Sequence, residues 1–460
     1  MNFIKIHRIS ILLVLASVLF YGSFAYALQR ADFIKLLCLY AALFFLFYKI
    51  VQSNSENFKF LFWTGIALRA VFLFAIPNLS QDFYRFLWDG RLLVQGINPY
   101  LSTPDSFTLF GMRSIMEGPM LIDSMGSLNA SHYTNYPPVA QFIYGITALF
   151  AGKSILGSVI VMRLFLIAAD IGTLYFGKKL LEKLKLPILH LFWFFLNPFI
   201  IIELTGNLHF EGVMAFFLVG ALYFLVSKKW LWSALFLGLS VATKLIPLLF
   251  LPLLLPYFLN EFPSRMQALK KLTFYYLTVL GTVLLLFLPF LSTAFIENFT
   301  ATLSLYFSSF EFNASIYYLI RWVGFETVGW NIIGTVGKIL PIIVVLFLLY
   351  LSFFRKAKNL RQLLVLLLFG ICFYYLLSTT VHPWYLSIPL ILSIFTKYRF
   401  MLVWSFMIVL SYTAYPASGF KENLWLVSLE YVVVIGFFVW EVVWKKRNLA
   451  SMLPRDTNSG

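Results

Sequence analysis

Residues 80–91 of the chain read SQDFYRFLWDGR, and residues 96–100 read GINPY. The stretch follows a hydrophobic segment and contains two acids, Asp82 and Asp89, and two arginines, Arg85 and Arg91. On a helix, Asp82, Arg85 and Asp89 are spaced i, i+3 and i+7 and share one face, while most of the apolar residues lie on the other. An amphipathic helix of this kind rests on a membrane surface with its carboxylates turned away from the lipid. We therefore predict a juxtamembrane helix here.

The composition around this stretch is that of a membrane protein. Of the 460 residues, 61% are hydrophobic and 12% are charged, whereas about a quarter of the residues of a soluble domain are charged. Apolar runs near 20 residues recur along the chain, and open sheet edges are excluded from lipid. We predict an all-α polytopic protein that forms one integral-membrane domain over residues 1–460.

We predict about 14 membrane spans (12 to 14, with boundaries uncertain by a few residues). They divide the domain into N-terminal spans (1–77), a large outer loop (78–155), central spans (156–291), a second outer loop (292–330) and C-terminal spans (331–460). The predicted spans are 9–27, 33–51, 58–77, 156–177, 187–205, 211–227, 229–243, 245–258, 272–291, 331–353, 362–380, 385–396, 400–415 and 425–444.

The distribution of charge sets the expected orientation. The net charge of +16 is explained by lysine and arginine clusters in short cytoplasmic loops, so we expect the lipid bilayer and no nucleic acid as a partner. With the N-terminus inside, the cluster at 178–185 is cytoplasmic and the loop 78–155 is outside, with 137–151 as a second juxtamembrane helix. This orientation predicts a multi-pass protein of the cell inner membrane with its site facing the periplasm or exterior. Cys38 and Cys372 lie in apolar spans, so we expect neither a disulfide nor a thiolate metal site.

Ionisable residues gather on the predicted outer side, where each has a functional and a structural interpretation. Asp82 and Asp89 are candidate general bases, or they simply pair with Arg85. Lys244 either binds a phosphate or caps carbonyls at a helix end. In the third span, Arg69 is expected to pair with Asp170. The remaining candidates on the outer side are Arg91, Tyr136, Arg163, Glu203, His209, Glu211, Arg321, His382 and Tyr385.

Several short motifs, in their order and spacing, resemble the GT-C fold integral-membrane glycosyltransferases. The chain resembles in particular the bacterial polyprenol-phosphate-mannose-dependent mannosyltransferases and, more remotely, GPI mannosyltransferase I. The resemblance covers most of the chain from about residue 60. It is carried by Asp82, WDGR (88–91), GINPY (96–100), YPP (136–138), Arg163, Asn197-Pro198, Glu203, GNLHFEG (206–212), Lys244 and HPWY (382–385).

The resemblance implies a bundle of transmembrane helices that transfers a hexose, mannose in this family, from a polyprenyl phosphate to a glycan, lipid or protein hydroxyl. It implies an acid of the first outer loop as the base of an inverting reaction, which maps onto Asp82 with Asp89 as the second candidate. Two departures keep the division of roles open: Gln81 precedes Asp82, and Glu211 stands where relatives often carry an aspartate.

The remaining candidates divide between the two substrates. Lys244, Arg163, His382, Tyr385 and Arg321 are candidates for the donor phosphate, because the leaving anion needs positive charge and hydrogen-bond donors. The candidates for the acceptor or sugar are Glu203, His209, Glu211, Arg85, Arg91 and Tyr136. The chemistry requires no cofactor, and a divalent metal stays an open alternative. Two other functions also stay open: a transporter or flippase of a lipid-linked sugar, and a lipid-linked oligosaccharide ligase of the same fold.

Overall fold

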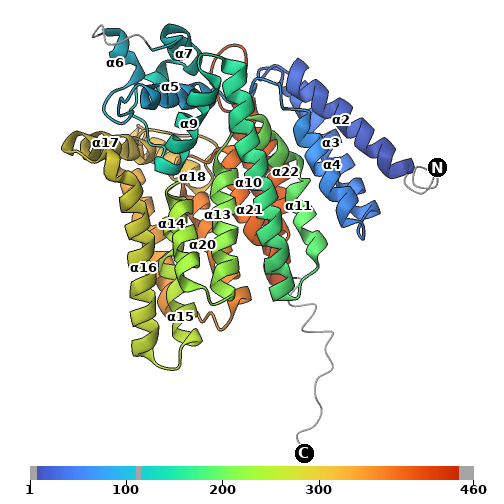
Figure 1. Ribbon diagram of the computed structural model, residues 1–460, viewed down its shortest axis with the longest axis vertical. Coiled ribbons are helices and arrows are strands. Elements are labelled where there is room, and N and C mark those ends of the chain that lie inside the picture. The colour runs from blue at the N-terminus through green and yellow to red at the C-terminus, as the bar shows by residue number, and fades with distance from the viewer. Residues whose placement is uncertain (1–7, 110–114, 445–460) are drawn as a thin grey trace, which may run out of the picture.

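The computed structural model describes residues 8–109 and 115–444, and its elements are helices (Figure 1). Within these residues there is no strand, and the one β-type pairing is an isolated parallel bridge between Phe312 and Thr380. The predicted all-α polytopic class is confirmed. The lysines and arginines of residues 445–455, at the C-terminal end of the last predicted span, lie outside the described residues.

Seven of the described helices are long and apolar enough to cross a membrane. A further pair, Ile188–Phe195 and Pro198–Gly206, is bent by 51° and counts as an eighth span if taken together. The pair comprises η1 (Ile188–Leu191), α11 (Phe192–Phe195), α12 (Pro198–Ile200) and the π-helix η2 (Ile201–Gly206). The seven long helices are α2 (Arg8–Ala27), α3 (Phe33–Ser53), α10 (Ile155–Leu184), α16 (Arg265–Phe287, continued by η5, Leu288–Phe290), α19 (Ile333–Phe354), α20 (Leu360–Leu377) and α23 (Leu424–Val439, continued by η8, Trp440–Trp444).

The predicted number of spans is higher than these seven or eight, because the other predicted spans form shorter helices. Helix α14, for example, is 12 residues long, which at 1.5 Å per residue is well short of a 30 Å hydrocarbon core. Each predicted span still coincides with helical structure. The shorter helices are α4 (Phe58–Ala70), α13 (Glu211–Val226), α14 (Trp230–Val241), the run η3 (Ile246–Phe250), η4 (Pro252–Leu254) and α15 (Leu255–Glu261), then η6 (Pro383–Leu386) with α21 (Ser387–Ile394), and α22 (Phe400–Met407) with η7 (Ile408–Ala414).

The bundle has two chemically different ends. At one end, which we call the basic end, Arg361 donates to the carbonyl of Leu184, and Lys228 pairs with Glu261 at 2.9 Å. Here the predicted cytoplasmic clusters of α10 and of the α19–α20 connection meet. At the other end, the loop end, the small helices of the first large loop crowd together in the upper part of Figure 1. They are α5 (Asp82–Val94), α6 (Pro104–Leu109), α7 (Gly118–Met125), α8 (Ser127–Ala130) and α9 (Pro138–Ala151), joined by α17 (Thr293–Ser308) and α18 (Ile316–Val328).

Helix α5 differs from its prediction as a membrane-surface helix. Its apolar face is buried, and so are Arg85 and Asp89 on the polar face, because α7, α8 and the segment before α9 fold over it; Arg91, which lies outside the polar face, is buried as well. Gly90 allows α9 to approach closely, since a Cβ at this position would lie 2.3 Å from the carbonyl oxygen of Tyr144. Only the first residue of the polar face, Asp82, is left partly accessible. The predicted second helix, α9, begins at Pro138, and the amide of Val139 in its first turn donates to the carbonyl of Ala242 at the end of α14.

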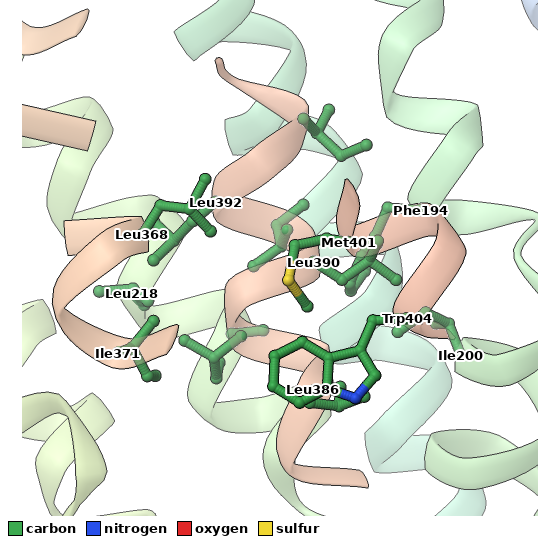
Figure 2. Packing of buried hydrophobic residues seen from close by; sticks show 14 of the residues in the cluster. Phe194, Ile200, Leu218, Leu368, Ile371, Leu386, Leu390, Leu392, Met401 and Trp404 are labelled. Atoms are coloured by element: carbon green, nitrogen blue, oxygen red, sulfur yellow. The ribbon is translucent and has the colours of Figure 1, made fainter. Parts of the chain in front are cut away.

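The main apolar core lies between the bent pair and the C-terminal helices (Figure 2). Trp404 and Met401 of α22 and Leu390 of α21 pack at its centre, each at most 1% exposed. In the third predicted span, Arg69 Nε donates to Asp170 Oδ2 at 2.7 Å, and both side chains are buried. The predicted Arg69–Asp170 pair is confirmed, and it ties α4 to α10 inside the bundle.

Candidate active site

A cavity of about 1310 Å³ lies at the loop end of the bundle. This exceeds the roughly 300–1,000 Å³ of a pocket for one small molecule, so the cavity has room for two reacting ligands. One part of its wall is polar and includes Arg30, Asp82, Lys244 and His382. The other part is apolar and is formed by Leu245, Ile246, Leu248, Leu249, Leu303, Phe307, Pro341, Val344 and Val345.

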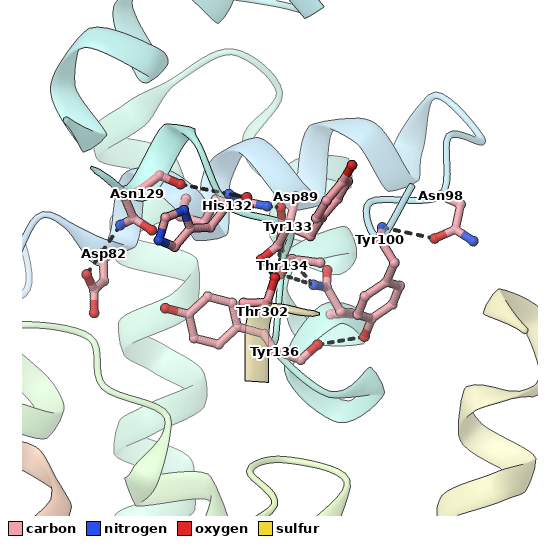
Figure 3. Close-up of polar contacts among 12 residues, drawn as sticks. Asp82, Asp89, Asn98, Tyr100, Asn129, His132, Tyr133, Thr134, Tyr136 and Thr302 are labelled. Carbon is pink, nitrogen blue, oxygen red and sulfur yellow. Dashed lines mark hydrogen bonds and ion pairs between the residues drawn. The ribbon is translucent and has the colours of Figure 1, made fainter. Parts of the chain in front are cut away.

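Asp82 brings a carboxylate to the polar wall from the first turn of α5 (Figure 3). Its amide nitrogen lies 3.3 Å from Ser80 Oγ, and Asn129 Nδ2 lies 3.5 Å from its Oδ1. Burial raises the pKa of the Asp82 carboxyl above its ordinary value, and the charges of Lys244 and Arg30 oppose this rise. A carboxylate made more basic by desolvation suits proton abstraction, and the nearby cations favour its ionised form.

Lys244 lies on the same wall, between the end of α14 and the start of η3. Its Nζ is 2.7 Å from Oε1 of Glu211, the first residue of α13, which is fully buried and does not line the cavity. Lys244 also sits 5.6 Å from the ring centroid of Tyr136, which lines the cavity as well. The lysine is therefore directed into the cavity by a carboxylate behind it.

A column of aromatic rings forms the next part of the wall. The His382 ring stacks on the Trp384 ring with their centroids 4.6 Å apart, and it also stacks on the Phe312 ring with their centroids 5.0 Å apart. His209 stacks on Trp384 at 3.7 Å from behind, and it does not line the cavity. Burial, with Lys244 and Arg30, lowers the pKa of His382 to about 3. His382 therefore reaches the cavity as a neutral imidazole, and an N–H of the ring is what it can offer to an anion. Tyr385 lines the cavity beside it.

Backbone pairing holds this column together. The Phe312 amide donates to the carbonyl of Thr379 at 3.1 Å, and the Val381 amide donates to the carbonyl of Phe312 at 2.8 Å. The isolated bridge thus fastens the segment before α18 to the segment that carries His382.

Arg321 lines the cavity, but its charge is compensated locally. It pairs with Glu311, which also accepts from Tyr317 and from Asn331 Nδ2 at 2.7 Å. Its guanidinium lies 4.2 Å from the ring centroid of Tyr318.

Four predicted site residues lie away from the cavity wall. Asp89 accepts from Arg85 Nε at 3.0 Å, from Thr134 Oγ1 at 2.5 Å and from Gln141 Nε2 at 2.8 Å (Figure 3). Arg85 also donates to the carbonyls of Asn129 and His132. Arg91 donates hydrogen bonds to the carbonyls of Met116 and Lys153 and to the carboxylate of Glu117. Glu203 accepts a hydrogen bond from the Tyr412 hydroxyl at 2.6 Å. These contacts fix the loops around the site rather than reach into it.

Arg163 also lies away from the cavity. Its guanidinium donates to the carbonyls of Phe72, Leu73, Ala75, Thr205 and Gly206, and it is fully buried. It therefore joins the turn after α4 to the end of η2.

Several cavity residues were not singled out in the sequence. Arg30 belongs to the short connection between α2 and α3. The one feature of the sequence that could have identified it is that it is a positively charged residue on the predicted outer side, opposite the basic clusters. His132, Glu311, Lys421 and Glu422 also line the cavity and lie in predicted outer loops. Among the described residues, no group of three or more His, Cys, Asp or Glu side chains is placed to hold a metal ion.

The family described as "Alpha-(1->6)-mannopyranosyltransferase, N-terminal domain" matches residues 13–260, which is more than half of the chain. The chain belongs to this mannosyltransferase family. The matched part of the mannosyltransferase fold contains Arg30, Asp82 and Lys244, whereas Arg321, His382 and Tyr385 follow it.

Two relatives carry the same name, alpha-(1->6)-mannopyranosyltransferase A. The protein from Mycobacterium tuberculosis is 20% identical over 358 residues, which cover 74% of this chain and 66% of the relative. The protein from Corynebacterium glutamicum is 21% identical over 208 residues, which cover 45% of this chain and 40% of the relative. The chain thus spans just under two thirds of the length of the first of these mannosyltransferases.

Proposed function

We propose that the protein transfers a hexose, mannose by its family, from a polyprenyl phosphate to an acceptor hydroxyl. The observation that carries this proposal is a single cavity in which the Asp82 carboxylate, the Lys244 ammonium and the His382 imidazole share a wall next to an apolar groove. The acceptor is a glycan, a lipid or a protein, and residues 1–460 act as one integral-membrane domain.

The apolar part of the cavity suits a prenyl chain. It is lined by residues of η3, α17 and α19, and its lining residues Phe307 of α17 and Val345 of α19 are 39% and 51% exposed. Exposed apolar side chains on a membrane helix face lipid tails. A donor can therefore enter sideways from the bilayer, with its tail in the groove and its phosphate beside Lys244.

Asp82 is the base in this proposal. Of the three acids between which the sequence left the role open, it alone lines the cavity, since Asp89 is enclosed by its partners and Glu211 lies behind Lys244. Asp82 accepts the proton of the acceptor hydroxyl while the oxygen attacks the anomeric carbon opposite the phosphate, which inverts the configuration. The leaving phosphate is received by the ammonium group of Lys244, the ring N–H of His382 and the hydroxyl of Tyr385.

The acceptor reaches Asp82 from the loop end, past Asn129, His132 and Tyr136. The basic end faces the cytoplasm in this proposal, because short lysine- and arginine-rich connections stay inside. The reaction then takes place on the periplasmic or outer face of the inner membrane.

The test is transfer of labelled mannose from mannosyl polyprenyl phosphate by the purified protein in detergent, where transport of a lipid-linked sugar has no meaning. Asp82→Asn should lower turnover by at least about 1,000-fold with an unchanged fold, given the scale of general-base and linked effects. Wild-type protein that binds this donor without releasing or transferring its sugar would instead support a transporter. A requirement for a pyrophosphate donor would support the ligase.

A further inference from the structure

Arg30 is held at the cavity by the connection between α2 and α3. Asn78 Nδ2, four residues before Asp82, donates to the carbonyls of Phe24 at 2.7 Å and Leu28 at 3.1 Å. Tyr26 donates from its hydroxyl to the carbonyl of Val71 at 2.9 Å. The backbone that carries Arg30 is therefore fastened to the segment that leads into Asp82.

The side chain of Arg30 is also fixed in place. Its guanidinium carbon lies 3.1 Å from the ring centroid of Tyr415, so the planar group stacks on the ring. Tyr415 in turn packs on Phe312, the first ring of the column that contains His382. A guanidinium held this way retains little rotational freedom, and ordering it on a ligand costs little.

The charge of Arg30 differs from those of Lys244 and Arg321, which also line the cavity, in having no carboxylate against it. Lys244 has Glu211 at 2.7 Å, and Arg321 has Glu311. Within the described residues, no carboxylate lies within 4.0 Å of the Arg30 guanidinium, and its buried Nε has no hydrogen-bond partner. A buried donor without a partner is costly, and a fixed cation without a counter-ion attracts an anion.

The proposed reaction supplies such an anion. The acceptor O–H gives its proton to Asp82, the new bond joins the acceptor oxygen to the anomeric carbon, and the bond from that carbon to the phosphate oxygen breaks. The electron pair stays on the phosphate, which changes from a diester with one negative charge to a monoester with up to two. A cation at this phosphate is attracted more strongly as the bond breaks, so it lowers the barrier rather than only tightening donor binding.

We infer that Arg30 binds the phosphate of the polyprenyl phosphate and stabilises the charge that develops on it as the sugar leaves. This inference rests on the proposed function. Lys244 and His382 contact the same phosphate, and Arg30 supplies the positive charge that no carboxylate neutralises.

The experiment compares Arg30→Gln and Arg30→Lys with Lys153→Gln, which removes an exposed cation from the same end of the molecule without touching the cavity. Each variant is assayed for kcat, for the KM of mannosyl polyprenyl phosphate, and for inhibition by polyprenyl phosphate. Arg30→Gln should lower kcat about 100-fold, the scale of one lost oxyanion donor, and change the donor KM less than about 5-fold. Inhibition by polyprenyl phosphate should weaken more than donor binding does, Arg30→Lys should recover part of kcat, and Lys153→Gln should match wild type.

Unchanged kcat and unchanged inhibition in a folded Arg30→Gln protein would overturn the inference, as would an effect confined to the KM of the acceptor. If Arg30→Gln does not fold, the neutral variant Arg30→Met carries the same comparison, because wild-type values for all three constants in it would exclude a role for the positive charge. Wild-type protein that neither uses the donor nor is inhibited by polyprenyl phosphate would refute the proposed function itself, which is a different result.

Discussion

The Nζ of Lys244 lies 2.7 Å from the Oε1 of Glu211, and only the lysine of this pair faces the cavity. Glu211 is fully buried at the start of α13, so its position is set by the bundle core and not by the loops. The carboxylate thus holds a flexible lysine in one direction before any ligand arrives.

Glu211→Gln should lower kcat roughly 10- to 100-fold, the loss typical when a partner that orients a binding group is changed. The amide keeps the shape but gives Lys244 no charge to pair with. The matched control is Glu261→Gln, which removes the carboxylate of the exposed Lys228 pair at the basic end and should leave kcat within about 2-fold. Full activity of Glu211→Gln would mean that Lys244 needs no orientation.

Asp89→Asn should destabilise the protein by about 3–5 kcal/mol, because it leaves the buried Arg85 without its counter-charge. Thermal unfolding in detergent measures this. The surviving folded fraction should keep near-normal turnover, in contrast to Asp82→Asn, which should lose turnover and keep its fold. A stable Asp89→Asn protein without activity would return Asp89 to the list of possible bases.

The raised pKa of Asp82 predicts two effects of rising pH: activity increases, and the contribution of Asp82 to folding stability decreases. The proposed base acts as a carboxylate, so under that proposal the acid limb of kcat/KM should lie above the ordinary aspartate value of about 3.9. Stability runs the other way: the contribution of Asp82 is fully present below the unfolded pKa and is lost as pH rises through the higher native pKa. Asp82→Asn should therefore melt at a higher temperature than wild type at neutral pH, and the difference should disappear in acid. An acid limb at or below pH 3.9 would contradict a desolvated base.

Asp170→Asn should cost about 3–5 kcal/mol, since it strands Arg69 inside the bundle. The double variant Arg69→Met, Asp170→Leu removes both charges and should regain most of the lost stability. Comparison of the single and double variants by thermal unfolding checks this, and a double variant as unstable as the single one would show that the pair itself holds α4 to α10.

Gly90→Ala should destabilise the loop end, because its methyl group would meet the Tyr144 carbonyl at 2.3 Å. Gly145→Ala, on the facing helix α9, places its methyl group at 3.6 Å from Leu93 and should be tolerated. Limited proteolysis of the region before α9 reports on this contact. Equal resistance of both variants would mean that α5 and α9 can separate at little cost.

Much of the architecture could be predicted because apolar runs and basic clusters are local signals. The helical class that they predict is confirmed, and each predicted span overlaps helical structure. The predicted 12 to 14 spans exceed the seven or eight helices that are long and apolar enough to cross a membrane, because apolar segments such as α14 form shorter helices. The placement of Asp82, Lys244, His382, Tyr385 and Arg321 around one cavity agrees with their predicted common side.

The structural roles of Arg163 and Arg91 could not be predicted, because their partners are mainly backbone carbonyls brought close only by folding. The sequence makes Arg163 a candidate for the donor phosphate and Arg91 a candidate for the acceptor or sugar, and in the structure both donate to backbone carbonyls. Arg30, by contrast, lines the cavity but was not predicted as a site residue, because a single positively charged residue in a short connection belongs to no sequence motif. The burial of the polar face of α5 was missed for a related reason, since the loop that covers it has no periodicity of its own.

The bridge between Phe312 and Thr380 has a consequence for how the cavity can change. Its hydrogen bonds use main-chain amides and carbonyls, which every amino acid except proline supplies in full. A substitution at Thr380, which lines the cavity, can therefore widen or narrow the chamber while the two segments stay fastened and the Phe312 ring keeps its place on His382. Under the proposed function, position 380 is where selectivity for larger or smaller sugars can be redesigned.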